Sequence, residues 1–268
     1  MGETLVLAGC GNMGRAMLAG WMKARPGLAV HVVEPADALR EAAAALGARA
    51  VAAPGELPEG LAPDLVFLAV KPQVMPAVLP DYARLKGAVF VSVAAGTTIA
   101  TLRAGLGAAA RVIRVMPNTP AAIGAGMSVL CPTPEVPEAA VALTEALMAT
   151  TGDVARIDDE GLMDAVTAVS GSGPAYVFHL IETLAAAGAA AGLPEALSLR
   201  LARQTVMGAG KLAAESAAPP GTLREQVTSP NGTTAAALSV LMAEDGLAPL
   251  MRRAVAAAKA RGEALARE

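Results

Sequence analysis

The chain has 268 residues, of which 54% are hydrophobic and 2% aromatic, and its formal net charge is −3 at pH 7. A chain of this length can form two modest domains or one large one, around a sizeable core built mainly from aliphatic side chains. The weak, mixed charge and the scarcity of aromatic residues argue against nucleic acid and against an anionic membrane surface as partners.

Residues 1–157 alternate between short apolar runs and helical patterns. We predict strands at residues 5–8, 29–33, 49–52, 65–70, 89–93, 112–116, 127–131 and 153–157, with helices between several of them, notably 13–24 and 36–46. Strands that are apolar on both faces and separated by helices are typical of a mostly parallel sheet covered on both sides. We therefore predict a Rossmann-like, doubly wound α/β domain over residues 1–157.

The first predicted strand leads into the sequence GCGNMG, where Gly9, Gly11 and Gly14 have the G-x-G-x-x-G spacing. In this pattern the first glycine permits a tight turn, the second lets backbone approach a pyrophosphate, and the third lets the helix pack on the strand. The phosphates would lie at the start of the following helix. We expect a dinucleotide site rather than a ligand-free turn, contacted by Gly9, Cys10, Gly11, Asn12, Met13 and Gly14.

Glu34 ends the second predicted strand, twenty residues after Gly14. A carboxylate there can accept hydrogen bonds from the adenosine ribose hydroxyls, and it would repel a 2′-phosphate. The expected cofactor is NADH or NADPH, with NADH favoured. The alternative is a solvated glutamate that contacts no ligand.

Three later strand ends should face the same crevice, because ligands of open α/β sheets bind beyond the carboxyl ends of the strands. We assign Lys71, which Pro72 follows, to loop geometry first and to a phosphate or ribose contact second. The Asn118 amide either points toward the nicotinamide or holds a turn between two prolines. The residues expected to line the cofactor from these loops are Ala69, Val70, Lys71, Pro72, Ala94, Ala95, Gly96 and Asn118.

From residue 158 onward the pattern changes to long runs rich in Ala, Leu and Met. We predict helices at residues 159–169, 174–192, about 195–216, 223–227, 234–243 and 249–267, which together form an all-helical domain over residues 158–268. Their apolar faces are broader than one small bundle needs. We therefore favour a domain that completes its core against a second chain over a closed monomeric bundle.

Two polar, glycine-bearing loops in this half each precede a helix: SGSGPAY at residues 170–176 and TSPNGTT at residues 228–234. Free N–H groups at a helix start can bind a carboxylate, and nearby hydroxyls can bond a nitrogen. Ser and Thr at such positions more often cap the helix. Two such loops in a chain with a dinucleotide site favour a substrate pocket.

The remaining reactive side chains are few. We expect Cys10 and Cys131 to be buried reduced thiols, since they lack C-x-x-C spacing, and His31 and His179 to be packed rather than catalytic. We recognise no catalytic triad, metal cluster or paired-carboxylate motif. Hydride transfer fits this composition, because the cofactor carries the difficult chemistry. With no signal peptide or membrane span recognisable, a cytoplasmic protein is expected.

The sequences GCGNMG, FLAVKPQ, VSVAAG, RVMPNTPA, AVTAVSGSGPAY and VTSPNGTTAAAL occur in this order over nearly the whole chain. In these motifs the chain resembles the pyrroline-5-carboxylate reductase family, and the last two motifs are the most specific. The resemblance implies NAD(P)H-dependent hydride transfer to the C=N bond of 1-pyrroline-5-carboxylate, which gives L-proline and completes proline biosynthesis. It also implies a homodimer formed through the helical domain, with decamers in some members.

The resemblance also implies roles for the second loop. The segment matching residues 229–234 binds the substrate carboxylate through backbone N–H groups, and the residue matching Thr234 bonds the ring nitrogen. Glu160 and Asp164 are candidates for the pocket edge, with solvated helix charges the favoured interpretation. The expected substrate-binding residues are Ser229, Pro230, Asn231, Gly232, Thr233, Thr234, Ser172 and Gly173, with Thr234 as the catalytic residue.

Two positions depart from the family pattern: Asn231, where the family usually has glycine, and Glu34, where many members carry Ser or Arg. Asn tolerates the left-handed backbone conformation, so we expect the loop to keep its shape. One alternative function is a related two-domain imine or hydroxy-acid reductase, although such relatives place a lysine in the helix that here reads DAVTAVSGSGPAYVFHL and has none. Another is a non-catalytic NAD-binding regulatory protein, which would not require the TSPNGTT loop.

Overall fold

The computed structural model describes residues 3–265 and divides into two compact units. One unit runs up to Gly171 and includes the chain again from Lys259, and the other is Ser172–Ala258. The sheet ends close to the predicted domain boundary at residue 157, but the short helical segments up to Gly171 belong to the first unit. The division into a dinucleotide domain and a substrate domain at residue 157 stays a prediction.

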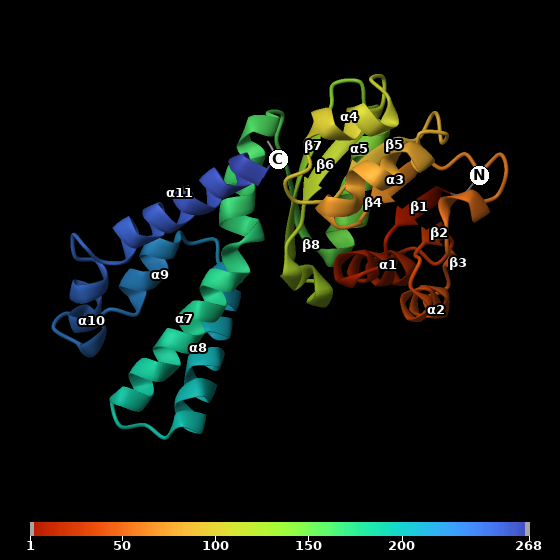
Figure 1. Cartoon of the computed structure of the whole chain (residues 1–268). Helices are drawn as coiled ribbons and strands as arrows, with labels where there is room; N and C mark the ends of the chain where they lie inside the picture. The colour runs from red at the N-terminus through yellow and green to blue at the C-terminus, as the bar shows by residue number, and fades with distance from the viewer. Residues whose placement is uncertain (1–2, 266–268) are drawn as a thin grey trace. The chain divides into compact units, whose positions relative to one another are not determined.

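The first unit is built on an eight-stranded sheet with the order β3-β2-β1-β4-β5-β6-β7-β8 (Figure 1). The strands β1 to β6 are parallel, β7 runs antiparallel to β6, and β8 is parallel to β7. Each apolar run predicted as a strand forms one, which confirms the doubly wound, mostly parallel sheet. The strands are β1 Thr4–Ala8, β2 Ala29–Val33, β3 Arg49–Val51, β4 Leu65–Leu68, β5 Val89–Ser92, β6 Arg111–Met116, β7 Gly126–Pro132 and β8 Gly152–Arg156.

Helices cover both faces of this sheet, so each strand contributes alternate side chains to two hydrophobic cores. Leu7 of β1 packs in one core with Trp21, whose indole N–H donates to the Leu147 carbonyl oxygen at 3.1 Å. Val6 of β1 packs in the other core with Leu102. The helices of this layer are α1 Asn12–Ala24, α2 Asp37–Ala45, α3 Met75–Tyr82, α4 Ile99–Leu106 and α5 Glu138–Met148.

The single helix predicted at residues 159–169 is wrong. A 3₁₀ turn at Glu160–Leu162 leads into the short helix α6, Met163–Val166, and then into a π-helical turn at Thr167–Gly171. The Asp159 carboxylate caps the 3₁₀ turn by accepting the Gly161 N–H at 2.8 Å. π-Helical turns occur frequently at functional sites.

The second unit consists of helices joined by short loops. The helices α7 and α8 pack against each other, and the Ser198 hydroxyl of α8 donates to the Ala185 carbonyl oxygen of α7 at 2.6 Å. The last residues of α11 belong to the first unit. The helices are α7 Gly173–Ala190, α8 Glu195–Glu215, α9 Pro220–Gln226, α10 Thr233–Leu241 and α11 Leu247–Leu265.

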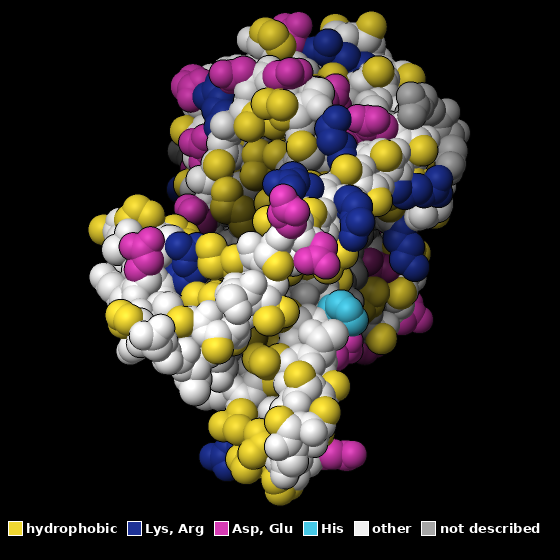
Figure 2. All heavy atoms as spheres, turned by 90° about the vertical axis from the view of Figure 1, so that its left-hand side faces the viewer, with side chains coloured by type: hydrophobic (Ala, Val, Ile, Leu, Met, Phe, Trp, Pro, Cys, Tyr) yellow, Lys and Arg dark blue, Asp and Glu magenta, His cyan; other side chains and the backbone are white. Residues whose placement is uncertain are grey.

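This helical unit buries few of its own side chains. Among its described residues, only Ser198 and Ala202 are buried, whereas Phe178 is 59% exposed and Val240 is 70% exposed. Figure 2 shows hydrophobic side chains spread over the helices, with few charged groups among them. No helix among residues 3–265 has the length and hydropathy needed to cross a membrane.

Candidate functional site

The strand order reverses its direction between β1 and β4, whose carboxyl ends lie at one edge of the sheet. The chain passes from β1 to β2 and β3 on one side, and then returns to β4 on the other side of β1. The carboxyl ends of β1 and β4 therefore flank a topological switch point, where open α/β sheets bind their ligands. The loops predicted to line the cofactor follow β1, β4, β5 and β6, and the parallel sheet brings all four to this edge.

The three motif glycines meet different constraints. Gly9 has φ +88°, and a Cβ there would lie 2.8 Å from the Ala69 carbonyl oxygen. A Cβ on Gly14 would lie 2.4 Å from the Gly9 carbonyl oxygen, so the helix and the loop touch backbone to backbone. A Cβ on Gly11 would meet no heavy atom within 4 Å. The packing of the chain thus requires Gly9 and Gly14, whereas Gly11 keeps a space open.

The open space lies at the start of α1. Gly11 is the N-cap residue of this 13-residue helix, with no side-chain capping bond and no acidic residue in the first turn. The first N–H groups of the helix are therefore available to an anion, which the helix dipole also favours. The geometry fits a dinucleotide pyrophosphate at the position where the sequence predicts one.

Glu34 differs from a solvated strand-end residue, because it is only 7% exposed. Its carboxylate accepts the Cys10 N–H at 2.7 Å on one oxygen and the Ala36 N–H at 3.0 Å on the other. The side chain therefore ties the glycine loop to the turn after β2. Each carboxylate oxygen retains a further acceptor position for a ribose hydroxyl.

Asn118 uses both ends of its amide within the first unit. Its Oδ1 accepts the Met127 N–H at 2.9 Å, and its Nδ2 donates to the Ser170 carbonyl oxygen at 3.2 Å and to the Ser170 hydroxyl at 3.3 Å. Of the two sequence interpretations, this geometry matches the turn-holding one. Lys71 lies exposed just before a 3₁₀ turn at Pro72–Val74, so a phosphate contact from it stays a prediction.

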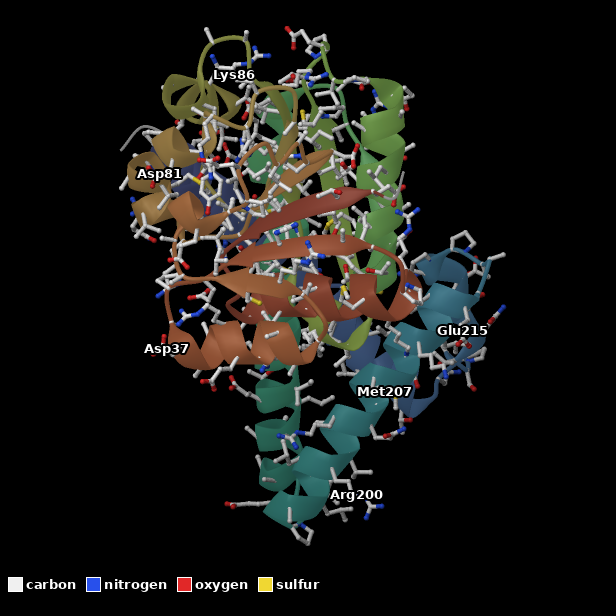
Figure 3. All side chains as sticks on the ribbon, turned by 90° about the vertical axis from the view of Figure 1, so that its right-hand side faces the viewer. Asp37, Asp81, Lys86, Arg200, Met207 and Glu215 are labelled. Carbon is white, nitrogen blue, oxygen red and sulfur yellow. The ribbon has the colours of Figure 1, made fainter. Side chains whose placement is uncertain are left out.

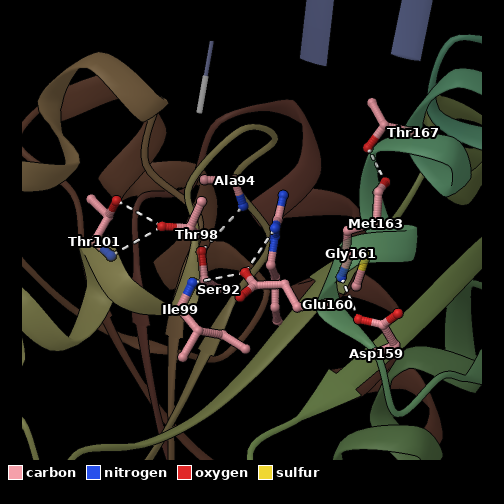
Figure 4. A network of polar contacts seen from close by, with 11 residues as sticks. Ser92, Ala94, Thr98, Ile99, Thr101, Asp159, Glu160, Gly161, Met163 and Thr167 are labelled. Carbon is pink, nitrogen blue, oxygen red and sulfur yellow. Dashed lines mark hydrogen bonds and ion pairs between the residues drawn. The ribbon is translucent and has the colours of Figure 1, made fainter. Parts of the chain in front are cut away.

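The loop after β5 is held at both ends (Figure 4). At its start the Ser92 hydroxyl accepts the Ala94 N–H at 3.4 Å, and at its end Thr98 caps α4 by accepting the Thr101 N–H at 3.1 Å. Ala94, Ala95 and Gly96, which the sequence predicts to line the cofactor, lie between these two anchors. The backbone of this loop is therefore anchored at the carboxyl end of β5.

Glu160 is not a solvated helix charge, so the favoured interpretation of this residue is wrong. Its Oε1 accepts the Ile99 N–H at 2.8 Å and one Arg114 guanidinium N–H at 2.8 Å. Arg114, on β6, is 4% exposed and was missed as a site candidate. An arginine within the apolar strand RVIRVM was the available signal, because arginine is almost never fully buried unless paired.

The TSPNGTT loop forms a tight turn directly before α10. The Gly232 N–H donates to the Ser229 carbonyl oxygen at 3.0 Å. Asn231 has φ +57°, and among the described residues it is the one non-glycine residue with a positive φ. The loop thus adopts the left-handed conformation that the sequence led us to expect of asparagine.

The helices that follow the two polar loops have no side-chain cap at their N-termini. The N-cap of α10 is Gly232, and the N-cap of α7 is Ser172, which makes no side-chain capping bond. The first N–H groups of α10, at Thr233 and Thr234, are thus not capped by the residue before them. This arrangement favours ligand binding over simple capping as the role of the TSPNGTT loop.

The cysteines and one histidine behave as expected. Both Cys10 and Cys131 are buried and free. His31 is buried in β2, and this burial, with the positive Arg49 nearby, lowers its pKa. The expectation that His179 is packed is wrong for the single chain, because its side chain is 74% exposed. No group of three His, Cys, Asp or Glu side chains within residues 3–265 is placed to hold a metal ion.

Comparison with known proteins identifies the family. Residues 160–265 match the model described as pyrroline-5-carboxylate reductase dimerisation, and residues 4–96 match NADP oxidoreductase coenzyme F420-dependent. The pyrroline-5-carboxylate reductase of Pseudomonas aeruginosa is 38% identical over 267 residues, 98% of this chain and 97% of that protein. The chain belongs to the pyrroline-5-carboxylate reductase family.

Solved structures of pyrroline-5-carboxylate reductases agree with this fold. The structure from Coxiella burnetii has a TM-score of 0.91 and 31% identity and covers 99% of both chains. The Plasmodium falciparum structure, with NADP bound, has a TM-score of 0.81 and 28% identity and covers 98% of both. These likenesses support a nicotinamide cofactor, and the match to a dimerisation model indicates a homo-oligomer.

Proposed function

We propose that this protein reduces 1-pyrroline-5-carboxylate to L-proline, with NADH as the preferred hydride donor. The observation that carries the proposal is the start of α10, where a left-handed Asn231 and a glycine N-cap leave backbone N–H groups for a carboxylate. Family membership supports the same reaction. When bound, the reduced nicotinamide supplies a hydride to the carbon of the C=N bond.

The chain's own groups bind and orient the reactants. Gly11 and the first turn of α1 receive the pyrophosphate, and the buried Glu34 carboxylate receives the ribose hydroxyls. This carboxylate is also the basis for NADH preference, because a 2′-phosphate beside it would be repelled. The loops after β4 and β5 line the cofactor through their backbone.

The substrate carboxylate lies at the α10 N-terminus, on the N–H groups of Thr233 and Thr234. The Thr234 hydroxyl bonds the ring nitrogen and fixes the orientation of the C=N bond. The substrate binds with that nitrogen already protonated by solvent, which makes the carbon electrophilic, so no strong acid is required from the protein and hydride addition leaves a neutral amine. Ser172 and Gly173, at the start of α7, complete the proposed pocket.

The helical unit forms a homodimer through its exposed apolar faces. Among the described residues of this unit only Ser198 and Ala202 are buried, and a second copy offers the same apolar surface. Assembly beyond the dimer, into a decamer, stays a prediction from the family resemblance, as do the cytoplasmic location and the absence of nucleic-acid partners.

The decisive experiment is a turnover assay with purified protein, 1-pyrroline-5-carboxylate and either NADH or NADPH. We expect loss of reduced-nicotinamide absorbance, formation of proline, and a higher kcat/KM with NADH. Absence of turnover with both cofactors would overturn the assignment, and a higher kcat/KM with NADPH would overturn the cofactor preference.

A matched pair of variants tests Thr234. Thr234→Val removes the hydroxyl but keeps the side-chain shape, and we expect kcat/KM for the substrate to fall about tenfold or more. Thr234→Ser keeps the hydroxyl and should stay within about threefold of wild type. Equal kinetics for Thr234→Val and wild type would remove this hydroxyl from the mechanism.

A further inference from the structure

The N-terminus of α4 is held by a side chain from a distant segment. The amide N–H of Ile99, the first residue of α4, donates to Oε1 of Glu160, which lies 61 positions along the chain. Ile99 directly follows the loop that contains Ala94, Ala95 and Gly96. The position of that loop therefore depends on the side chain of Glu160.

Arg114 fixes the Glu160 carboxylate in this place. Its guanidinium lies 2.8 Å from the same Oε1, and its side chain is only 5% exposed. Arg114 stands beside Ser92 in the β5–β6 register, and Ser92 holds the start of the same loop. Figure 4 shows the Glu160 carboxylate beside Ile99 at the start of α4.

We propose that Glu160 is a positioning residue for the cofactor, acting through the Ile99 N–H on the backbone at residues 94–96. This inference rests on the proposed function, because that loop is where the cofactor is proposed to lie. A carboxylate oxygen bonded at once to a helix-start N–H and to a buried guanidinium has little freedom, so it fixes where the loop ends. The ion pair with Arg114 holds the Glu160 carboxylate in this position.

Two double variants isolate this effect. Arg114→Met/Glu160→Gln and Arg114→Met/Glu160→Ala both remove the ion pair, so neither leaves a buried unpaired charge. They differ in that glutamine still offers an oxygen to Ile99 and alanine does not. We expect the Kd for NADH, measured by fluorescence titration, to be about tenfold higher in the alanine version.

A purely structural role would act differently. It would lower the melting temperature and the fraction of active enzyme without changing the Kd of the folded protein. We expect instead a raised KM for the cofactor, with kcat and the KM for 1-pyrroline-5-carboxylate within about twofold at saturating cofactor. Equal Kd values in the two double variants would overturn the proposal.

Glu135→Ala is the matched control, because Glu135 pairs with Arg103 at the other end of α4, at 2.8 Å. Its loss should leave the Kd for NADH unchanged. If it raises the Kd as much as the Glu160 change does, the effect belongs to general loosening of α4 and the proposal fails. A wild-type chain that binds neither NADH nor NADPH would instead overturn the proposed function.

A measurement on the wild-type chain does not depend on the folding of variants. The Ile99 amide is the first of its helix, so its protection from hydrogen exchange reports the bond to Glu160 directly. We expect slow exchange that NADH slows further. Exchange as fast as that of an exposed loop amide would contradict the proposal.

Discussion

Glu34 combines two roles in one carboxylate, one visible in its hydrogen bonds and one proposed for the cofactor. Glu34→Ser should raise the ratio of kcat/KM with NADPH to kcat/KM with NADH about tenfold, because the repulsion of a 2′-phosphate is lost. It should also lower kcat/KM with NADH, since the Cys10 N–H loses its acceptor. Steady-state kinetics with both cofactors checks this.

The control for Glu34 is Asp37→Asn. Asp37 is the first residue of α2 and its side chain is 82% exposed, so the change removes a nearby negative charge without touching the glycine loop (Figure 3). The cofactor ratio should stay within about twofold of wild type. An unchanged ratio in Glu34→Ser would show that Glu34 serves only to hold the loop.

Asn231 tests the shape of the substrate loop. Asn231→Ala puts alanine at φ +57°, where its Cβ strains the backbone and its side chain cannot form the local hydrogen bonds of asparagine. We therefore expect a loss of about 1 kcal/mol in stability and a higher substrate KM. Asn231→Gly, which adopts this conformation freely, should keep both near wild type. Chemical denaturation measures the stability of both variants, and steady-state kinetics measures their substrate KM. An alanine variant with wild-type stability and KM would show that the loop tolerates another conformation.

The sequence predicted which residue types belong at the site better than it predicted their partners. Gly9, Gly11 and Gly14 could be assigned because each role depends on backbone space at a fixed spacing. The contacts of Asn118 with Ser170, and of Glu160 with Ile99, join segments that are distant in sequence. No local pattern encodes which two loops meet at a sheet edge, so these bonds needed the structure.

At the scale of elements, β2 carries a titratable group into the sheet. His31 pairs in register with Val6 and Arg49 of the neighbouring strands, and its folded-state pKa lies below its usual value because of burial and the nearby Arg49. The folded protein therefore binds a proton less readily than the unfolded chain. Stability attributable to this group is present at neutral pH and is lost as the pH falls below the usual histidine range.

We predict that wild type loses stability between about pH 7 and pH 5 and that His31→Gln loses less over this window. Urea denaturation at each pH measures the difference, and the pH dependence, rather than the absolute stability of the variant, is the quantity compared. Parallel curves for the two proteins would show that His31 does not contribute.

The predicted strands are reproduced because long apolar runs leave few other options than a buried strand. The helix at residues 159–169 was predicted wrongly for the opposite reason. Its apolar periodicity is real, but the bond of Glu160 to Ile99 ties its start to α4, and the bonds of Asn118 to Ser170 tie its end to the loop after β6. Tertiary contacts of this kind override helix propensity, which is a weak local preference.

At the scale of the whole molecule, the helical unit leaves many apolar side chains exposed in the single chain. His179 lies in this unit and is exposed for the same reason, although the sequence predicted that it would be packed. A helical unit with so few buried side chains is marginal by itself, so its stability should depend on association. The melting temperature of the wild-type protein should then rise with protein concentration.

Leu201, in the first half of α8 and 47% exposed, tests this association. Leu201→Asp places a charge on a face proposed to pack against a second chain, which should weaken the dimer by about 3 kcal/mol or more, roughly a hundredfold in Kd. Arg200→Gln, at the neighbouring position labelled in Figure 3, is the control and should remain dimeric. Sedimentation velocity over a concentration series reports both. A monomeric wild type, or a Leu201→Asp protein that dimerises as tightly as wild type, would show that the apolar face of α8 does not form the dimer interface.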